Sequence, residues 1–434
     1  MSEKFSVFWF RRDLRLSDNH GLLQALKSQN KVLPVFIFDT DILSKLENSK
    51  DRRVDFIFQA LNNINENLEK NGKCVKIYHG KPLEVFREII ETYPVEKVFC
   101  NEDYEPSAIQ RDAEIKDLFH LNNIEFLSYK DQVHFHKNDI LKADKSPYTV
   151  YTPYSKQWLL KYNTQETENY PSEKLLNHFI DAEKQNFSLQ DIGFQPSGYR
   201  YQSPSLNTET VKNYHETRNF PALATSEMGV HLRFGTISVR ALAKIAKQLN
   251  ETYLKELIWR EFFMQILYHF PIVVHHSFKT KYDGIQWLSD EESLKKWQEG
   301  KTGFPLVDAG MRELNETGFM HNRVRMVCAS FLTKHLLTDW RIGEAYFAEK
   351  LLDYDLAANN GNWQWSAGSG CDAAPYFRVF NPEEQQKKFD PDFVYIKKWI
   401  KEFGTSSYPK PMIDHKFARE RALETYKKGL QELL

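Results

Sequence analysis

The chain has 434 residues, 41% of them hydrophobic and 27% charged, and its formal net charge is −1 at pH 7. This composition is typical of globular proteins and excludes the disordered and fibrous classes, and the length suits two or three domains. The small net charge excludes a global positive field that attracts nucleic acid, but not a local basic patch. No apolar run is long enough for a membrane span and the first residues lack a signal-peptide pattern, so we expect a cytoplasmic protein.

Residues 1–130 alternate short β-rich runs with helical patterns. The β-rich runs are Phe5–Phe10, Val32–Phe38, Val75–Gly80, Lys97–Glu102 and Ile124–Tyr129. Helical periodicity covers Arg52–Lys70 and Leu83–Tyr93 between them. Strands that alternate with helices predict a parallel sheet with crossover helices. We therefore expect an α/β domain with a doubly wound parallel sheet over residues 1–130.

Residues 131–204 carry scattered prolines among polar residues, which is typical of a long interdomain linker. Within it, "TPYSKQWLLKY" predicts one helix with Thr152 as N-cap and Pro153 at the first position. Residues 205–434 are nearly all helical in pattern. There, "TISVRALAKIAKQLN" predicts a helix capped by Thr236, and "YLKELIWREFFMQILYHFP" is apolar almost all round, as buried helices are.

The apolar helix of the C-terminal half carries a carboxylate and a guanidinium. Glu256, Trp259, Arg260 and Phe263 stand at i, i+3, i+4 and i+7, so they share one helical face. Charged groups on an apolar helix need partners or a ligand. The simpler interpretation is an ion pair between Glu256 and Arg260 within the helix, and the alternative is a binding site.

Two further stretches of the helical half combine polar and aromatic residues. In "HNRVRMV", Asn322, Arg325 and Met326 share a face, and in "DYDLAANNGNWQW" the two aspartates are expected to close a helix before an "NNG" turn. Such a set suits a large ligand that is partly polar and partly aromatic. Thr225 and Ser226 could receive phosphates. The residues alone predict a buried site for an aromatic cofactor. The four cysteines are widely spaced, so we expect no metal site.

At these residues the chain resembles the DNA photolyase and cryptochrome family over essentially its whole length. The blocks that carry the resemblance are "FWFRRDLRLSDN", "ELIWREFF", "GKTGFPLVDAGMREL", "GFMHNRVRM" and "LDYDLAANNGNWQWSAGSGCDAAPYFRVFNP". Within the family the chain is most similar to class I photolyases that act on cyclobutane pyrimidine dimers. The resemblance implies an all-α domain over residues 205–434 that binds flavin adenine dinucleotide (FAD).

The resemblance also implies roles for residues around FAD. Arg325 and Asp353 form a buried pair beside the flavin ring, Asp355 contacts the ring edge, and Asn359 faces its reactive nitrogen. The residues implied to hold the rest of the cofactor are Tyr214, Thr225, Ser226, Gly229 and Arg260. Trp363, Trp340 and Trp287 match the electron-transfer tryptophans, from inner to outer; for each of them, packing in the core is the simpler interpretation.

The implied activity is that of a deoxyribodipyrimidine photo-lyase, in which photoexcited reduced FAD passes an electron to a flipped-out pyrimidine dimer in UV-damaged DNA. Glu256 and Asn322 contact the dimer. The apolar wall against the flipped bases consists of Trp259, Phe263 and Met326. The arginines implied to contact phosphates are Arg218, Arg323 and Arg378, and a solvated surface position is the simpler interpretation of each.

Two other functions stay open: a cryptochrome-type blue-light receptor with the same flavin site, and a general flavoprotein oxidoreductase. Asn359 favours repair, because plant-type receptors carry an acid at that position. The chain shows no long tail for signalling, and we expect a monomer with no obligate protein partner. The phosphate loop departs from the family, since Gly229 and Val230 replace a hydroxyl residue and a proline. For an antenna chromophore, Glu105 suggests methenyltetrahydrofolate, whereas Val273 and Val274 leave a deazaflavin or no antenna equally open.

Overall fold

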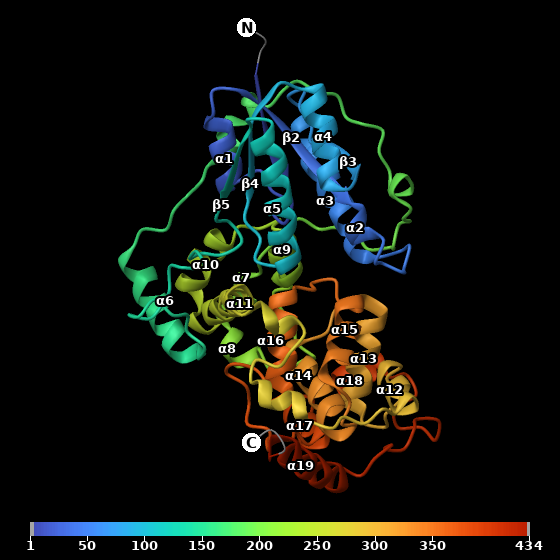
Figure 1. Ribbon diagram of the computed structural model, residues 1–434. Helices are drawn as coiled ribbons and strands as arrows, with labels where there is room; N and C mark the ends of the chain where they lie inside the picture. Colours follow the sequence, from blue (N-terminus) through green and yellow to red (C-terminus); the bar gives the residue numbers. More distant parts are fainter. Residues whose placement is uncertain (1–3, 432–434) are drawn as a thin grey trace. The chain divides into compact units, whose positions relative to one another are not determined.

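The computed structural model describes residues 4–431 of the chain (Figure 1). The chain divides into two compact units, neither of them continuous in sequence. The first unit comprises Met1–Ile140, Gln157–Leu206 and Glu227–Leu257, and the second comprises Leu141–Lys156, Asn207–Ser226 and Ile258–Leu434. Helices α6 (Tyr151–Thr164) and α11 (Glu251–His269) contribute residues to both units. The division of the chain into domains at residues 130 and 205 stays a prediction.

The first unit contains the parallel sheet that the sequence predicts. Within residues 4–431 the sheet has five strands in the order β3-β2-β1-β4-β5, and every pairing is parallel. The strands are β1 (Phe5–Phe10), β2 (Lys31–Asp39), β3 (Lys76–Gly80), β4 (Val95–Asn101) and β5 (Glu125–Tyr129). The chain adds β2 and β3 on one side of β1 and then β4 and β5 on its other side. This reversal of strand order is the arrangement of a doubly wound sheet. The predicted fold class is confirmed.

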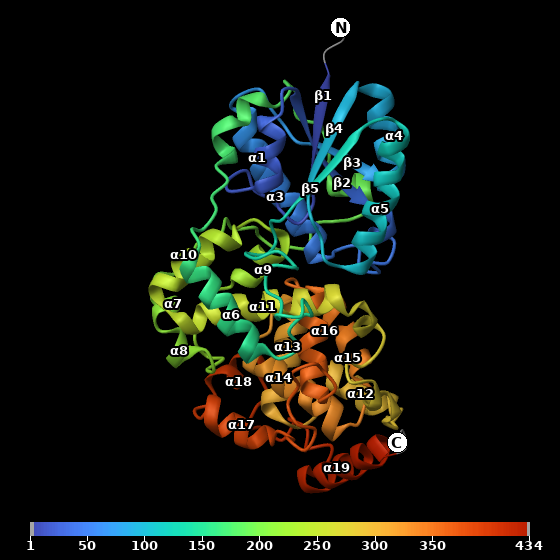
Figure 2. The same ribbon diagram turned by 60° about the vertical axis from the view of Figure 1, so that its left-hand side comes forward.

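Helices cover both faces of this sheet, as crossover connections require. Figure 2 shows α1 (His20–Lys27) and α3 (Arg52–Glu69) on one face, and α4 (Pro82–Thr92) and α5 (Pro106–Leu121) on the other. Val7, Leu33, Val35 and Phe86 are among the fully buried residues of the core beneath α4 and α5. The remaining helices of the unit are α2 (Thr40–Leu43), η1 (Ser172–His178), η2 (Leu189–Ile192), α9 (Met228–Phe234) and α10 (Val239–Leu249).

The second unit is helical (Figure 1). Besides its share of α6 and α11, its helices are α7 (Thr208–Lys212), α8 (Tyr214–Thr217), η3 (Pro271–Val274), η4 (Thr280–Gly284), α12 (Glu291–Gln298), α13 (Pro305–Thr317), α14 (Asn322–Ser330), η5 (Phe331–His335), α15 (Trp340–Lys350), α16 (Leu356–Ala367), α17 (Pro382–Phe389), α18 (Val394–Trp399) and α19 (His415–Gln431). Among residues 4–431, no helix has the length and apolar composition that crossing a bilayer requires.

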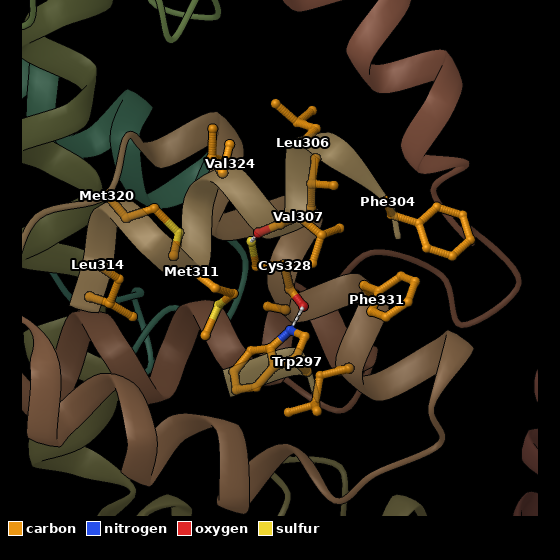
Figure 3. Close-up of a cluster of buried hydrophobic side chains, with 14 of the residues drawn as sticks. Trp297, Phe304, Leu306, Val307, Met311, Leu314, Met320, Val324, Cys328 and Phe331 are labelled. Carbon is orange, nitrogen blue, oxygen red and sulfur yellow. Dashed lines mark hydrogen bonds between the residues drawn. The ribbon is translucent and has the colours of Figure 1, made fainter. Parts of the chain in front are cut away.

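The core of the second unit contains buried residues of α12, α13, α14, η5, α15 and α16. Figure 3 shows the part of it that lies between α12 and η5. Trp297 is fully buried there, and its indole Nε1 donates a hydrogen bond of 3.2 Å to the carbonyl oxygen of Cys328. Met311, Met320 and Val324 belong to the same cluster of buried residues. Helices α14 and α16, which carry polar residues of the candidate site, pack through this core.

Three helix boundaries differ from those expected. The α6 helix begins at Tyr151, so Thr152 lies inside it and is not its cap. The α10 helix is capped by Ser238, whose Oγ accepts a hydrogen bond from the amide of Ala241, while the hydroxyl of Thr236 bonds to His231. The "NNG" sequence lies inside α16 and makes no turn. A local sequence pattern does not show which of two nearby hydroxyl residues caps a helix, because tertiary packing selects the cap.

Candidate active site

Two helices of the second unit approach each other closely at a glycine. A Cβ atom at Gly361 of α16 would overlap the aromatic ring of Phe263 of α11. The ring of Phe263 also lies 5.4 Å from that of Trp259 on the same helix. Glycine inside a helix costs stability, and close approach of a neighbour is the usual reason to keep it. The glycine therefore brings the aromatic residues of α11 against the helix that carries Asn359.

Arg325 and Asp353 form the ion pair that the resemblance implies. The Nη2 atom of Arg325 donates to the Asp353 carboxylate at 3.0 Å, and Nε donates to the carbonyl oxygen of Met320 at 2.7 Å. The side chains are 25% and 17% exposed, so the pair is partly exposed, whereas a buried one was expected. Partial exposure of both side chains lowers the cost of desolvating the pair.

Asp355 begins α16 and was wrongly expected to close a helix. Its side chain is the N-cap and accepts a hydrogen bond from the amide of Ala358. A carboxylate at this position satisfies a free backbone donor and interacts favourably with the positive end of the helix. Asp355 is 8% exposed. One turn later, α16 presents Asn359, also 8% exposed.

Glu344 of α15 fixes the side-chain amide of Asn359. The Nδ2 atom donates to the carbonyl oxygen of Glu344 at 3.0 Å and to its Oε1 at 2.8 Å. Burial raises the pKa of Glu344, and the hydrogen bond from Asn359 acts in the opposite direction. Because both bonds use Nδ2, the amide oxygen is the atom left to accept a hydrogen bond from a ligand N–H. No spacing in the sequence links Glu344 to Asn359, so sequence reasoning missed it.

The three predicted electron-transfer tryptophans belong to one hydrophobic cluster of the second unit. Trp340 and Trp363 are fully buried in it, and the partly buried Trp287 packs against it. A Cβ at Gly343 of α15 would overlap the Trp363 ring, so this ring lies directly on the α15 backbone. The Trp287 ring meets that of Tyr426 edge to face at 5.7 Å. The structure brings the three indoles into one core, and their role in electron transfer stays a prediction.

The residues expected to hold the phosphates lie in short segments. Tyr214 begins α8, and its ring lies 5.5 Å from the guanidinium of Arg218. Thr225 and Ser226 are partly buried and stand just before α9, a short helix that the sequence did not predict. Gly229 lies inside α9 and belongs to the first unit, and the other three residues belong to the second.

Arg323, one of the arginines expected to contact DNA, lies beside an amide and an aromatic ring. Its Nη2 donates to Oδ1 of Asn219 at 2.7 Å, and its guanidinium lies 4.4 Å from the ring centre of Phe389. Within residues 4–431 no carboxylate pairs with it. Burial lowers the pKa of Arg323, and the charge of Arg218 lowers it further. A partly buried guanidinium that is also repelled by a neighbouring arginine favours an anionic ligand.

For the other predicted site residues, the structure gives the helix or loop that carries them and their exposure. Asn322 is exposed as the first residue of α14, and Met326 is partly buried one turn later. Arg378 is exposed in the loop between α16 and α17. Glu256 and Arg260 are partly buried on α11, and their roles stay predictions.

Comparison with known proteins decides the family. One family model, DNA photolyase, matches residues 6–172, and another, the FAD binding domain of DNA photolyase, matches residues 253–406. The chain is 34% identical to a deoxyribodipyrimidine photo-lyase of Halobacterium salinarum, over 98% of this chain and 99% of that protein. It is also 34% identical to one of Escherichia coli, over 97% and 98% of the two chains. The chain belongs to the DNA photolyase family.

Solved structures of the photolyase family have the same fold. A class III photolyase from Agrobacterium tumefaciens superimposes with a TM-score of 0.87 at 31% identity, over 99% and 98% of the chains. An archaeal photolyase from Sulfolobus tokodaii, described with two FAD molecules, gives 0.79 at 31% identity, over 98% and 100%. A cryptochrome from Synechocystis gives 0.84 at 25% identity, over 97% and 99%.

The residues of the second unit fit the FAD of this photolyase domain. A flavin ring presents N–H and carbonyl groups at its edge and a wide apolar face. The oriented amide oxygen of Asn359, the Asp355 carboxylate and the Arg325–Asp353 pair match the polar edge. The aromatic side chains of Trp259 and Phe263 on α11 offer an apolar surface of the kind that suits a flat ring. FAD is the cofactor that this domain binds in the family.

Proposed function

We propose that the protein is a deoxyribodipyrimidine photo-lyase that repairs cyclobutane pyrimidine dimers in DNA with light. The observation that supports it most is Arg323, a half-buried guanidinium with no acidic partner among the described residues. Such a cation suits a DNA phosphate. Trp259, partly exposed on α11, provides an aromatic surface for a flipped base.

Some of the predicted site residues contact the dimer, and others hold the cofactor in position. Bound FAD, once reduced and excited by light, supplies the electron. Glu256 and Asn322 form hydrogen bonds to the dimer, and the amide N–H of Asn322 donates where negative charge develops. Trp259, Phe263 and Met326 exclude water around the bases. The Arg325–Asp353 pair, Asp355 and Asn359 orient the cofactor, and Arg260 with the segments around Tyr214, Thr225, Ser226 and Gly229 binds the rest of it.

The chain of tryptophans has a separate role in the proposal. Trp363, Trp340 and Trp287 would pass electrons from a reductant in solution to oxidised FAD and so keep the cofactor reduced. Trp363→Phe should abolish light-driven reduction of oxidised FAD and leave repair by chemically reduced protein intact. Reduction at the normal rate in this variant would mean that electrons reach the cofactor by another route.

Repair is tested with an oligonucleotide that contains one thymine dimer. The purified protein is incubated with it under blue light and in darkness, and intact thymines are counted. Light-dependent recovery supports the proposal, and no recovery by protein that holds reducible FAD contradicts it. Glu256→Gln should lower the repair yield several-fold while FAD content is unchanged. Glu251→Gln, an exposed acid of the same helix paired with Lys255, is the matched control and should repair normally.

A blue-light receptor of the cryptochrome type is the second candidate, because a cryptochrome superimposes on the chain with a TM-score of 0.84. The same assay separates the two functions. A receptor would bind and reduce FAD under light and leave thymine dimers unrepaired.

An antenna chromophore is a further part of the proposal. Glu105, expected to contact a folate, accepts hydrogen bonds from Arg12 at 2.8 Å and from Arg233 at 3.0 Å within the first unit. The archaeal relative is described with a second FAD as a light-harvesting cofactor. The absorption of pigment extracted from purified protein distinguishes methenyltetrahydrofolate, a deazaflavin, a second FAD and FAD alone.

We also propose that the protein is a cytoplasmic monomer. Its four cysteines are free thiols, the usual state in a reducing compartment. Sedimentation of the purified protein with and without dimer-containing DNA measures the oligomeric state, and a self-associating species would contradict the proposal.

A further inference from the structure

The aromatic surface of Trp259 is supported from behind by a second ring. Tyr151, the first residue of α6, stacks on the Trp259 indole with ring centres 3.6 Å apart and planes inclined by 5°. Tyr151 is 9% exposed, whereas Trp259 keeps part of its surface accessible. Both residues belong to the second unit. One face of the indole is therefore covered by Tyr151, and the ring is confined to one orientation.

The start of α6 is fastened to the same surface of α11. The ring of Tyr151 meets that of Phe262 edge to face at 5.9 Å, and Tyr154 lies 5.2 Å from Phe262. The hydroxyl of Tyr154 donates to Oε1 of Glu261 at 3.4 Å. These contacts fix the backbone that carries Tyr151, so its ring is a rigid support for Trp259.

Asp372 ties Tyr151 to the loop that follows α16. Its Oδ2 accepts a hydrogen bond of 3.0 Å from the backbone amide of Tyr151. This amide lies in the first turn of α6, where donors have no partner within the helix, so the carboxylate both satisfies it and complements the helix dipole. The same loop carries Arg378, six residues later. Tyr151 thus contacts both Trp259 and the loop that carries Arg378.

We propose that Tyr151 is a positioning residue for substrate: it holds Trp259 in the orientation in which the indole stacks on the flipped pyrimidine dimer. This inference rests on the proposed function. A free indole on a helix surface samples several rotamers, and ordering it on binding costs free energy. Stacking on Tyr151 removes that cost in advance, so it strengthens binding of the dimer and leaves the electron-transfer step unchanged.

The test measures dimer binding and repair separately. Tyr151→Ala should weaken binding of a dimer-containing oligonucleotide by about tenfold, while FAD content and the repair yield per bound dimer stay at the wild-type level. Tyr151→Phe keeps the stacked ring and should restore binding to within about twofold. Wild-type affinity in Tyr151→Ala overturns the inference. Wild-type protein that repairs no dimer overturns the proposed function instead, so the two failures are distinguishable.

A double-mutant cycle tests whether Tyr151 acts through Trp259. In a Trp259→Ala background, Tyr151→Ala should cause no further loss of affinity, since the ring that it supports is gone. Independent, additive losses overturn the inference. Asp372→Ala should weaken dimer binding about threefold through loss of one charge-assisted hydrogen bond. Asp392→Ala, at an exposed position beyond α17, is the matched control and should bind normally, and an equal loss in both variants contradicts the role given to Asp372.

Discussion

The amide of Asn359 depends on a partly buried carboxyl group that the sequence did not reveal. Glu344→Ala would keep the backbone carbonyl acceptor but leave the second N–H of Nδ2 without a partner, and an unsatisfied buried donor costs about 1–3 kcal/mol. We therefore expect this variant to lower the free energy of unfolding by that amount and to retain less FAD. Glu344→Gln keeps an acceptor oxygen and should lose less than about 1 kcal/mol. Urea unfolding and the ratio of FAD to protein measure both effects.

The control for Glu344 is Glu349→Ala, an exposed acid on the same helix that pairs with Lys350. It should leave stability and FAD content unchanged. If Glu344→Gln were as damaging as Glu344→Ala, the charge of Glu344, and not its hydrogen bond to Asn359, would be the important property.

Lys334 is a buried lysine with no acidic partner among residues 4–431. Its Nζ donates to the carbonyl oxygen of Ala367 at 2.9 Å and lies 3.7 Å from the ring centre of Tyr426. Burial lowers its pKa well below the ordinary value for lysine. The unfolded chain, with an ordinary lysine, binds this proton more tightly than the folded protein does. Through this residue the free energy of unfolding must therefore rise with pH until the lysine of the unfolded chain also titrates.

Lys334→Met removes that titration. Between pH 7 and 9 the unfolding free energy of the wild type should rise relative to that of the variant. Urea unfolding of both proteins at several pH values measures the difference. Lys296→Met, an exposed lysine paired with Glu292, should follow the wild type. Parallel curves for wild type and Lys334→Met would show that Lys334 stays protonated when folded.

At the scale of elements, the packing of α11 on α16 depends on the missing side chain of Gly361. Alanine is the better helix former, so Gly361→Ala would stabilise α16 if it were isolated. In the protein its Cβ would overlap the Phe263 ring, and we expect a net loss of about 1–3 kcal/mol from overpacking. Thermal unfolding measures this loss. Adding Phe263→Leu should recover part of it, and a stable Gly361→Ala single variant would show that the helices can move apart.

The same elements show what the sequence could and could not predict. Strands such as Phe5–Phe10 were recognisable because strands buried on both faces are continuously apolar. Helix ends were less certain: Ser238 and Thr236 are both good caps, and only the path of the chain selects Ser238. The "NNG" sequence was read as a turn because nothing local shows that Phe263 packs on Gly361. Glu344 and Tyr151 reach the site through tertiary contacts alone, which no single sequence displays.

At the scale of the whole molecule, binding to DNA must arise from local charge, because the net charge is −1. If Arg323 contacts a phosphate, Arg323→Ala should weaken binding to any duplex and reduce the slope of log affinity against log salt by about 0.9. Arg341→Ala is the control, since Arg341 of the same unit already pairs with Asp283 and Asp339. Its salt slope should match the wild type, and an unchanged slope for Arg323→Ala would remove Arg323 from the interface.

Four buried histidines among residues 4–431 make the stability of the folded protein sensitive to acid. Burial lowers the pKa of His134, His231 and His321 to about 4 and that of His335 to about 3. These side chains are neutral in the folded protein, whereas in the unfolded chain they take up protons below a pKa of about 6.5. The unfolded state therefore binds more protons in this range, and the free energy of unfolding must fall as the pH drops from about 6.5 to about 4.

His321 allows this loss to be assigned to one residue. Its ring caps α14 by accepting a hydrogen bond from the amide of Arg323, and the charges of Arg325 and Arg323 add to the effect of burial on its pKa. Asparagine can make the same cap without titrating. His321→Asn should therefore lose less stability than the wild type between pH 6.5 and 5, by about 1–2 kcal/mol. Denaturant unfolding at fixed pH values measures this difference. If the two proteins lost stability equally, His321 would already be protonated in the fold, and the acid sensitivity would belong to other groups.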